Sequence, residues 1–343
     1  MKQLLNTLYV MTQQSFLRLD HDTVKICVEG EKRGQVPLIH LGGIHCFGNV
    51  MVSPALLMRC AEEQRSIVFY DRKGRFKARV TGPTTGNVLL RKRQYDFSEE
   101  SEGPIGLARS FVAGKIQNCR QLLLRGARDS KIPSDATELR DTAGELGNSL
   151  RRLEKARSLD EVRGVEGYAS RKYFEVFTNL VKRNRGNFAL KGRSRRPPRD
   201  PMNALLSFLY TLLHHDCIGA CEGVGLDPQV GYLHTIRPGR AAMALDLMEE
   251  FRPVLADRLA LTLVNLGVIQ EHDFDCRVVG SVLLNERGRK TVVAEYQKKK
   301  QIESKHPLLK KKTPLGLLPH LQARLLARVL RGDIEYYPPF LSR

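Results

Sequence analysis

Two carboxylates and an imidazole are the side chains of this chain best suited to chemistry: Glu166, His234 and Glu249. They lie far apart in the sequence but could converge in a fold, and mixed carboxylate and imidazole ligation suits Mn²⁺ and tolerates Mg²⁺. Lysine and arginine total 56 against 37 acidic residues, which gives a formal net charge of +19. A metal site on so basic a chain predicts chemistry on a polyanion, most simply a nucleic acid.

Glu166 lies on the apolar face of a predicted helix. Ser158, followed three residues later by Glu161, is a capping-box pattern that predicts the start of this helix. Glu166 shares one stripe with four apolar or aromatic residues, Val162, Ala169, Tyr173 and Leu180. An inward carboxylate costs several kcal/mol unless it is paired. A metal ion or a structural arginine could supply that pairing.

Three acids, Asp246, Glu249 and Glu250, fill one arc of a second predicted helix. A solvated acidic face is the ordinary explanation of such a cluster. The neighbouring arginines favour a different one, in which the acids hold a cation against an incoming phosphate. His234 precedes these acids by a short connection that could fold it back toward them, although a single histidine is more often a surface or core residue than a ligand.

Basic residues cluster between 182 and 199, where no acid precedes Asp200. A solvated loop is the ordinary interpretation, but its position after the Glu166 helix favours contact with phosphates. Trp is absent, so contacts with the DNA backbone are more plausible than stacking on bases. The candidate DNA-binding residues are Arg237, Arg240, Lys182, Arg183, Arg185, Lys191, Arg193, Arg195 and Arg196. The lysines at 298–300 and 310–312 are less specific.

The pattern of the chain predicts an α+β fold with two domains. Residues 1–86 alternate as strands, with one helix near 54–64 and a hairpin at 71–74. Residues 87–103 are expected to be a linker, and 104–343 an all-helical catalytic domain. The segments 182–199 and 298–312 read as mobile loops. We expect helices at 104–126, 136–156, 158–183, 202–215, 240–266 and 314–331.

The seven cysteines are scattered, which argues against a disulfide framework and fits a reducing compartment. His214, His215, Cys217 and Cys221 lack the paired spacing of structural zinc sites. Neither a signal peptide nor an apolar run of membrane-spanning length is evident, so we expect a cytoplasmic protein without a membrane partner.

Five segments together resemble the universal CRISPR-associated integrase, the metal-dependent endonuclease of spacer acquisition, with a weaker likeness to its subtype I-C branch. They are HLGGIHCFGN at 40–49, GVEGYASRKYF at 164–174, DPMNALLSFLYTLL at 200–213, GYLHTIRPGR at 231–240 and ALDLMEEFRPVLADRL at 244–259. The resemblance implies that Glu166, His234 and Glu249 are catalytic residues and ligands of Mg²⁺ or Mn²⁺. Asp246 and Glu250 would be supporting or alternative groups.

The resemblance also implies a reaction and partners. A 3′-hydroxyl of a short double-stranded DNA would attack the CRISPR repeat by transesterification, which would insert a spacer into the array. A homodimer would join a small second adaptation protein in a heterohexamer, with a Cas4-type nuclease as a further partner. Two other hypotheses remain at this point: a structure-specific repair nuclease acting on branched DNA, and a DNA scaffold without catalytic activity.

Overall fold

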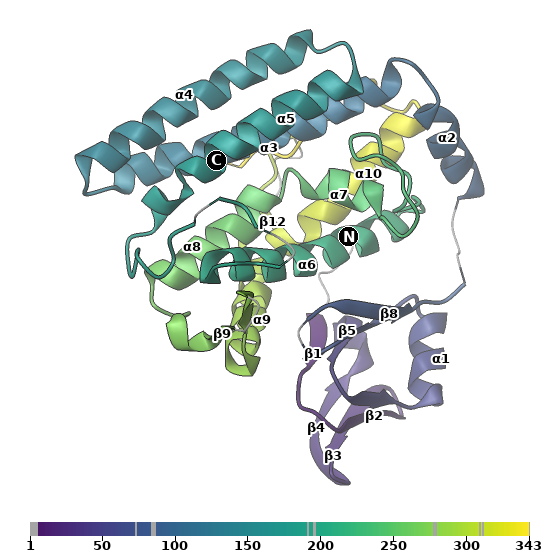
Figure 1. The fold of residues 1–343 in the computed structure, drawn as a ribbon. Coiled ribbons are helices and arrows are strands. Elements are labelled where there is room, and N and C mark those ends of the chain that lie inside the picture. The colour runs from purple at the N-terminus through teal and green to yellow at the C-terminus, as the bar shows by residue number, and fades with distance from the viewer. Residues whose placement is uncertain are drawn as a thin grey trace.

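The computed structural model describes residues 6–72, 74–83, 87–190, 192–194, 197–276, 280–308, 310 and 312–342. A strand-rich N-terminal part is followed by a larger helical part (Figure 1). This arrangement confirms the predicted α+β class.

Two four-stranded sheets and one helix form the N-terminal part. In the first sheet the order is β1-β5-β7-β8, with only β8 antiparallel to its neighbour, and in the second it is β4-β3-β2-β6. Leu17, Ile44 and Ile67 are fully buried in the core of this part. The elements are β1 (Asn6–Val10), β2 (Ser15–Asp20), β3 (Thr23–Val28), β4 (Glu31–Pro37), β5 (Leu41–Phe47), β6 (Val50–Val52), α1 (Pro54–Glu62), β7 (Ser66–Tyr70) and β8 (Phe76–Val80).

The helical part consists of nine described α-helices and two short strand pairs. The helices are α2 (Val88–Ser98), α3 (Gly103–Asp129), α4 (Pro133–Lys155), α5 (Leu159–Glu175), α6 (Pro201–Glu222), α7 (Ala242–Met248), α8 (Arg258–Asn265), α9 (Glu286–Gln301) and α10 (Leu318–Leu330). The strand pairs are β9 (Phe274–Cys276) with β10 (Val282–Leu284), and β11 (Glu303–Lys305) with β12 (Lys312–Pro314).

Some predicted boundaries were wrong. The expected linker at 87–103 contains α2, the expected loop at 298–312 contains the end of α9 and strand β11, and the strand pairs make the second part less than purely helical. The single helix expected at 240–266 is α7, a π-helical turn at Arg252–Asp257 and α8. Pro253 explains this interruption, because proline has no N–H to donate and its ring clashes with the preceding turn.

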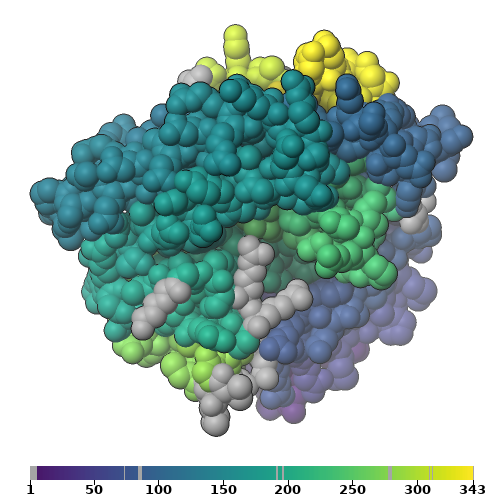
Figure 2. Space-filling model, turned by 45° about the horizontal axis from the view of Figure 1, so that its top comes forward, coloured from purple at the N-terminus to yellow at the C-terminus, as the bar shows by residue number. Residues whose placement is uncertain are grey.

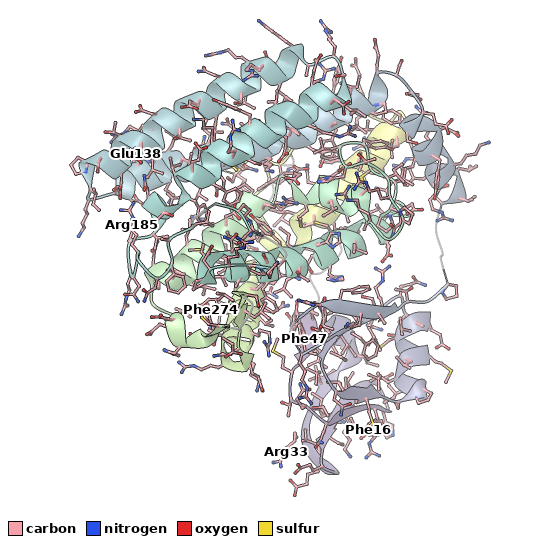
Figure 3. The ribbon with its side chains drawn as sticks, in the orientation of Figure 1. Phe16, Arg33, Phe47, Glu138, Arg185 and Phe274 are labelled. Atoms are coloured by element: carbon pink, nitrogen blue, oxygen red, sulfur yellow. The ribbon has the colours of Figure 1, made fainter. Side chains whose placement is uncertain are left out.

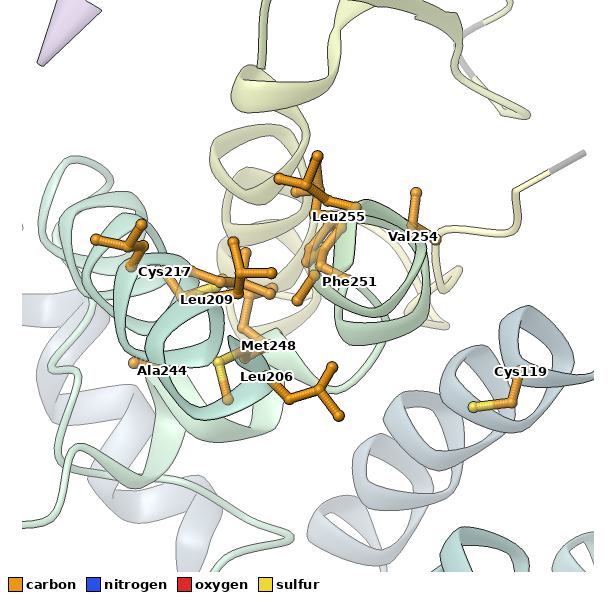
Figure 4. Close-up of a cluster of buried hydrophobic side chains, with 14 of the residues drawn as sticks. Cys119, Leu206, Leu209, Cys217, Ala244, Met248, Phe251, Val254 and Leu255 are labelled. Carbon is orange, nitrogen blue, oxygen red and sulfur yellow. The ribbon is translucent and has the colours of Figure 1, made fainter. Parts of the chain in front are cut away.

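Helix α6 is central to the helical part. Asp200 caps it, since its Oδ1 accepts a hydrogen bond of 2.7 Å from the backbone N–H of Asn203. Leu206 and Leu209 of α6 pack with residues of α7 and of the turn that follows it (Figure 4). Among the described residues α6 is the one helix long and apolar enough to span a membrane, but most of it is buried in the core, as expected of a central helix of a folded domain.

The two parts meet along β8, β5 and α6. Arg79 of β8 forms an ion pair with Glu222 at the end of α6, with Nη1 2.9 Å from Oε2. The rings of Phe47 and Phe208 lie 6.4 Å apart, and Figure 3 shows Phe47 at the side of the N-terminal part that faces the helices. The helical part therefore holds the sheet through both an ion pair and aromatic contacts.

Candidate active site

Glu166 lies midway along α5, on the side that faces α3. Its Oε1 contacts Nζ of Lys115 from α3 and accepts a hydrogen bond of 2.8 Å from the hydroxyl of Ser170. Lys115 is only 7% exposed. Burial works against ionisation of Glu166, but Lys115 outweighs it and lowers the pKa of this carboxyl. The inward carboxylate predicted on this helix therefore exists, and its partner is a lysine rather than an arginine.

Glu249 reaches the same lysine from the C-terminal end of α7. Its Oε2 lies 2.7 Å from Nζ of Lys115, and its Oε1 lies 3.0 Å from Nη2 of Arg252. Burial alone would raise the pKa of Glu249, but Arg252, Lys115 and His234 lower it to about 2. A buried carboxylate is thus kept ionised by cations on two sides.

His234 approaches Glu249 from the loop before α7. Its Nε2 lies 3.8 Å from Oε1 of Glu249. Its Nδ1 lies 2.7 Å from Oδ1 of Asp246, and because a carboxylate only accepts, Nδ1 carries the proton. The other ring nitrogen, Nε2, is therefore directed toward Glu249, and a second-nitrogen hydrogen bond of this kind is the usual way in which a metal-ligating histidine is oriented.

Asp246 also shapes the backbone that carries the histidine. Its carboxylate accepts hydrogen bonds from the backbone N–H groups of Tyr232, Leu233 and His234, at 2.6, 2.9 and 2.9 Å. A Cβ on Gly231 would come within 2.8 Å of Asp246 Oδ2 and within 2.6 Å of the backbone carbonyl carbon of Ala242, so only glycine fits here. The loop is folded around this one buried carboxylate.

A layer of polar groups lies behind Glu249. Tyr173 of α5 and Tyr210 of α6 donate hydrogen bonds of 2.9 and 2.6 Å to the buried carboxyl of Asp257. The guanidinium of Arg252 lies 5.1 Å from the centre of the Tyr210 ring. Burial raises the pKa of Asp257 to about 6, against the effect of the two tyrosines. These contacts fix the arginine that holds Glu249.

Glu250 is directed away from the site, so its expected supporting role does not match its contacts. Its carboxyl is buried against the C-terminal segment and contacts the hydroxyl of Tyr337, the backbone N–H of Phe340 and the side chain of Gln322. Burial raises its pKa to about 8. Neighbouring positions on a helix point about 100° apart, which separates Glu250 from Glu249.

The predicted DNA-binding residues divide into three groups. Arg237 and Arg240 lie in the His234 loop, and Lys182 and Arg183 follow α5 at the surface or close to it. Two arginines are already engaged within the fold. Arg185 forms paired contacts of 2.8 and 3.1 Å with Asp135 at the end of the bundle seen in Figure 3, and Arg193 binds Asn203 of α6. Lys191, Arg195 and Arg196 lie outside the described residues.

The donor set suits a divalent cation, but the ammonium of Lys115 is positioned between the carboxylates. Among the described residues no three His, Cys, Asp or Glu side chains are arranged closely enough to hold an ion as they stand. Oε2 of Glu249 is buried and, apart from its ion pair with Lys115, accepts no hydrogen bond of regular geometry from the described residues. Mg²⁺ and Mn²⁺ both accept carboxylate and imidazole ligands. The chemical types of Glu166, Glu249 and His234 therefore suit either ion.

Lys115 was not predicted from the sequence, although a signal existed. It lies on the apolar face of α3, four residues after Phe111 and four before Cys119, both of which are buried. A lysine in the middle of such a stripe must have an anionic partner, because an unpaired buried ammonium is strongly unfavourable.

Figure 2 shows the face of the molecule on which α5, the segment after α6 and the N-terminal part lie next to one another. In Figure 2 the teal surface of α5 lies directly above a green segment that follows α6, and the N-terminal part lies below both. The contacts between side chains, rather than the surface, define the site, whose residues come from α3, α5, the end of α7 and the loop before α7.

Comparison with known proteins now identifies the family. Residues 8–298 match the family model described as CRISPR associated protein Cas1. The chain belongs to the Cas1 family. It is 56% identical to a CRISPR-associated endonuclease Cas1 of Moorella thermoacetica, with 99% of each chain covered. It is also 34% identical to a Cas4/Cas1 fusion of Geobacter sulfurreducens, covering 98% of this chain and 60% of the fusion.

Solved structures agree with the Cas1 assignment. A Cas1 protein from Thermotoga maritima superposes with a TM-score of 0.81 at 25% identity, covering 96% of this chain and 97% of the other. A casposase bound to its integration product superposes with a TM-score of 0.82 at 21% identity, covering 97% and 93%. The second likeness is one of fold, since the sequences are so different.

Proposed function

We propose that this Cas1 protein is a DNA integrase and endonuclease that inserts short duplexes into a CRISPR array. The observation that carries this proposal is the linked set of contacts in which Glu166 and Glu249 share Lys115 and Nε2 of His234 lies 3.8 Å from Glu249, on a chain with a net charge of +19. Cas1 membership and a relative named as an endonuclease at 56% identity support it.

Glu166, Glu249 and Nε2 of His234 are the groups that would hold Mg²⁺ or Mn²⁺. When bound, such an ion supplies charge that stabilises the attacked phosphate and favours ionisation of the attacking hydroxyl. Asp246 keeps the proton of His234 on Nδ1, and Arg252 keeps Glu249 ionised and in place. Arg237 and Arg240, from the same loop as His234, are positioned to bind the DNA backbone beside the reacting bond.

The reaction that we propose is a transesterification. The 3′-hydroxyl of the incoming duplex forms a new phosphodiester bond with a repeat strand, and the 3′-oxygen of that strand leaves. With water as the nucleophile, the same groups would support hydrolysis. Both reactions need a positioned phosphate, which Arg237 and Arg240 would hold, and an ionised nucleophile, which a bound divalent ion would favour.

Two of the comparisons support part of the proposed partnership. A Cas6-RT-Cas1–Cas2 complex contains a chain of the same fold, and Cas4/Cas1 fusions occur among the relatives. We propose that this chain forms a homodimer, joins a small second adaptation protein in a heterohexamer and cooperates with a Cas4-type nuclease, as in subtype I-C systems, in the cytoplasm.

Glu166→Gln tests the proposal, because the amide keeps the size of the side chain and removes its charge. We expect duplex binding to persist and joining to a repeat-containing plasmid to fall by at least 100-fold. Glu145→Gln on α4 is the matched control, since Glu145 pairs with Lys172 and Tyr168 instead of with the site residues. Normal joining by the Glu166→Gln protein would contradict the proposal, and cleavage without joining by the wild type would favour a repair nuclease.

A further inference from the structure

The ammonium of Lys115 lies where one cation contacts both candidate ligand carboxylates. Nζ contacts Oε1 of Glu166 and lies 2.7 Å from Oε2 of Glu249. The side chain of Lys115 is 8% exposed and that of Glu249 is 2% exposed, so water does little to screen the contact. Each carboxylate therefore has an internal positive partner in the absence of any added ion.

We propose that Lys115 is an internal competitor of the metal: its ammonium pairs with Glu166 and Glu249 until a divalent cation displaces it. The inference rests on the proposed metal site and adds a residue that regulates it. A divalent ion and an ammonium cannot use the same two oxygens at once, because their like charges would repel each other at close range in a buried site.

The surroundings of Lys115 give the displaced ammonium no second acid to pair with among the described residues. Glu166 and Glu249 are the two carboxylates that form ion pairs with it, and the nearby guanidinium of Arg252 repels it. Binding of a metal therefore breaks two ion pairs. Lys115 weakens metal affinity and, in return, stabilises the metal-free protein.

This arrangement has a functional consequence. The two carboxylates stay ionised and near each other without a metal, so the site remains ordered between reactions. It also raises the concentration of free metal at which half of the sites are occupied. Lys115 is thus a positioning residue that acts through Glu166 and Glu249.

Lys115→Met tests the proposal by Mn²⁺ binding rather than by activity. We expect the Kd for Mn²⁺, measured by calorimetry and by the electron paramagnetic resonance signal of free Mn²⁺, to fall at least tenfold. We also expect the metal-free protein to melt at a lower temperature than the wild type and to gain more from added Mn²⁺. Lys115→Gln gives a milder version, because glutamine keeps a donor for one carboxylate but carries no charge.

Lys300→Met is the matched control. Lys300 is also buried, with 5% of its side chain exposed. It forms an ion pair of 2.8 Å with Asp216, whereas Glu166 and Glu249 pair with Lys115. Its replacement should lower the melting temperature and leave the Kd for Mn²⁺ unchanged. A tighter Kd in this control would show that loss of any buried lysine changes affinity, and would overturn the proposal.

The outcomes separate the two proposals. If wild-type protein binds Mn²⁺ and Glu166→Gln weakens that binding, the metal site stands. Unchanged or weaker binding by both Lys115 variants would then overturn only the competitor role. If wild-type protein binds no Mn²⁺ at a Glu166-dependent site, the metal site fails, and the role of Lys115 fails with it.

Discussion

Glu249 and Glu250 are adjacent in the chain, yet their carboxyl groups lie in opposite electrostatic environments. Glu249 contacts two cations, Lys115 and Arg252, and its pKa is lowered to about 2. Glu250 is buried against the C-terminal segment, and its pKa is raised to about 8. The two residues should therefore change the stability of the protein in opposite directions as pH changes.

For Glu249 the folded pKa lies below the unfolded value, so its contribution is present above about pH 4.5 and is lost as pH falls toward 2. Glu249→Gln should remove this acid sensitivity. It should also cost about 3–5 kcal/mol at neutral pH, because Lys115 and Arg252 lose their shared buried partner. Urea denaturation at several pH values measures both effects, and an unchanged midpoint at pH 7 would contradict them.

For Glu250 the folded pKa lies above the unfolded value, so the folded state holds a proton that the unfolded chain has lost. Its contribution to stability should fall as pH rises from about 4.5 to 8. Glu250→Gln cannot ionise and should lose less stability than the wild type between pH 5 and pH 9. Parallel denaturation curves for the two proteins across that range would show that Glu250 is already ionised in the fold.

Asp246→Asn should disrupt the orientation of His234. An amide presents one oxygen where the carboxylate presents two, so it cannot accept all of the three backbone hydrogen bonds and the Nδ1 hydrogen bond. We expect a 10- to 100-fold loss of joining activity, the usual scale for a group that orients a ligand. The affinity for duplex DNA should stay within about twofold, as gel-shift titration would show, and a larger loss would indicate general unfolding.

Gly231→Ala should displace the same loop by a steric route. The added methyl group would meet the backbone of Ala242 and the carboxylate of Asp246. We expect a loss of joining activity and of about 1–3 kcal/mol of stability. Gly219→Ala in α6 is the control, since a Cβ there has open space and alanine favours a helix. Equal effects of the two substitutions would contradict this account.

Arg237→Ala with Arg240→Ala should weaken duplex binding without affecting folding, because both side chains lie in the loop and form no ion pair with a described acid. If each arginine neutralises one phosphate, its removal should reduce the slope of log K against log salt by about 1. Arg185→Ala is the informative comparison: Arg185 is bound to Asp135, so its replacement should affect stability more than the salt slope.

The sequence predicted the elements that follow simple rules. Alternating residues predicted the strands, and Asp200 with Pro201 predicted the start of α6, because these patterns act over a few residues. The break after Met248 was not foreseen, since it depends on how a proline is accommodated within a buried turn. Lys115 was also missed, because its meaning depends on two carboxylates 51 and 134 positions further along the chain.

The partners of the site residues were harder to predict than the residues themselves. Glu166, His234 and Glu249 were singled out by residue type and by resemblance to a known family. In the structure Glu166 and Glu249 contact Lys115, and His234 lies against Glu249. Arg185 binds Asp135, whereas Arg237 stays exposed. The sequence could not distinguish these two arginines, because the role of each depends on its neighbours in space.

Tyr337 and Phe340 enclose the carboxyl of Glu250, one residue from Glu249. During synthesis this enclosure cannot form until residue 340 has left the ribosome, long after α3, α5 and α7 have emerged. Until then Glu250 would remain in water on the nascent chain, and its burial would follow only when residues 337–340 pack over it.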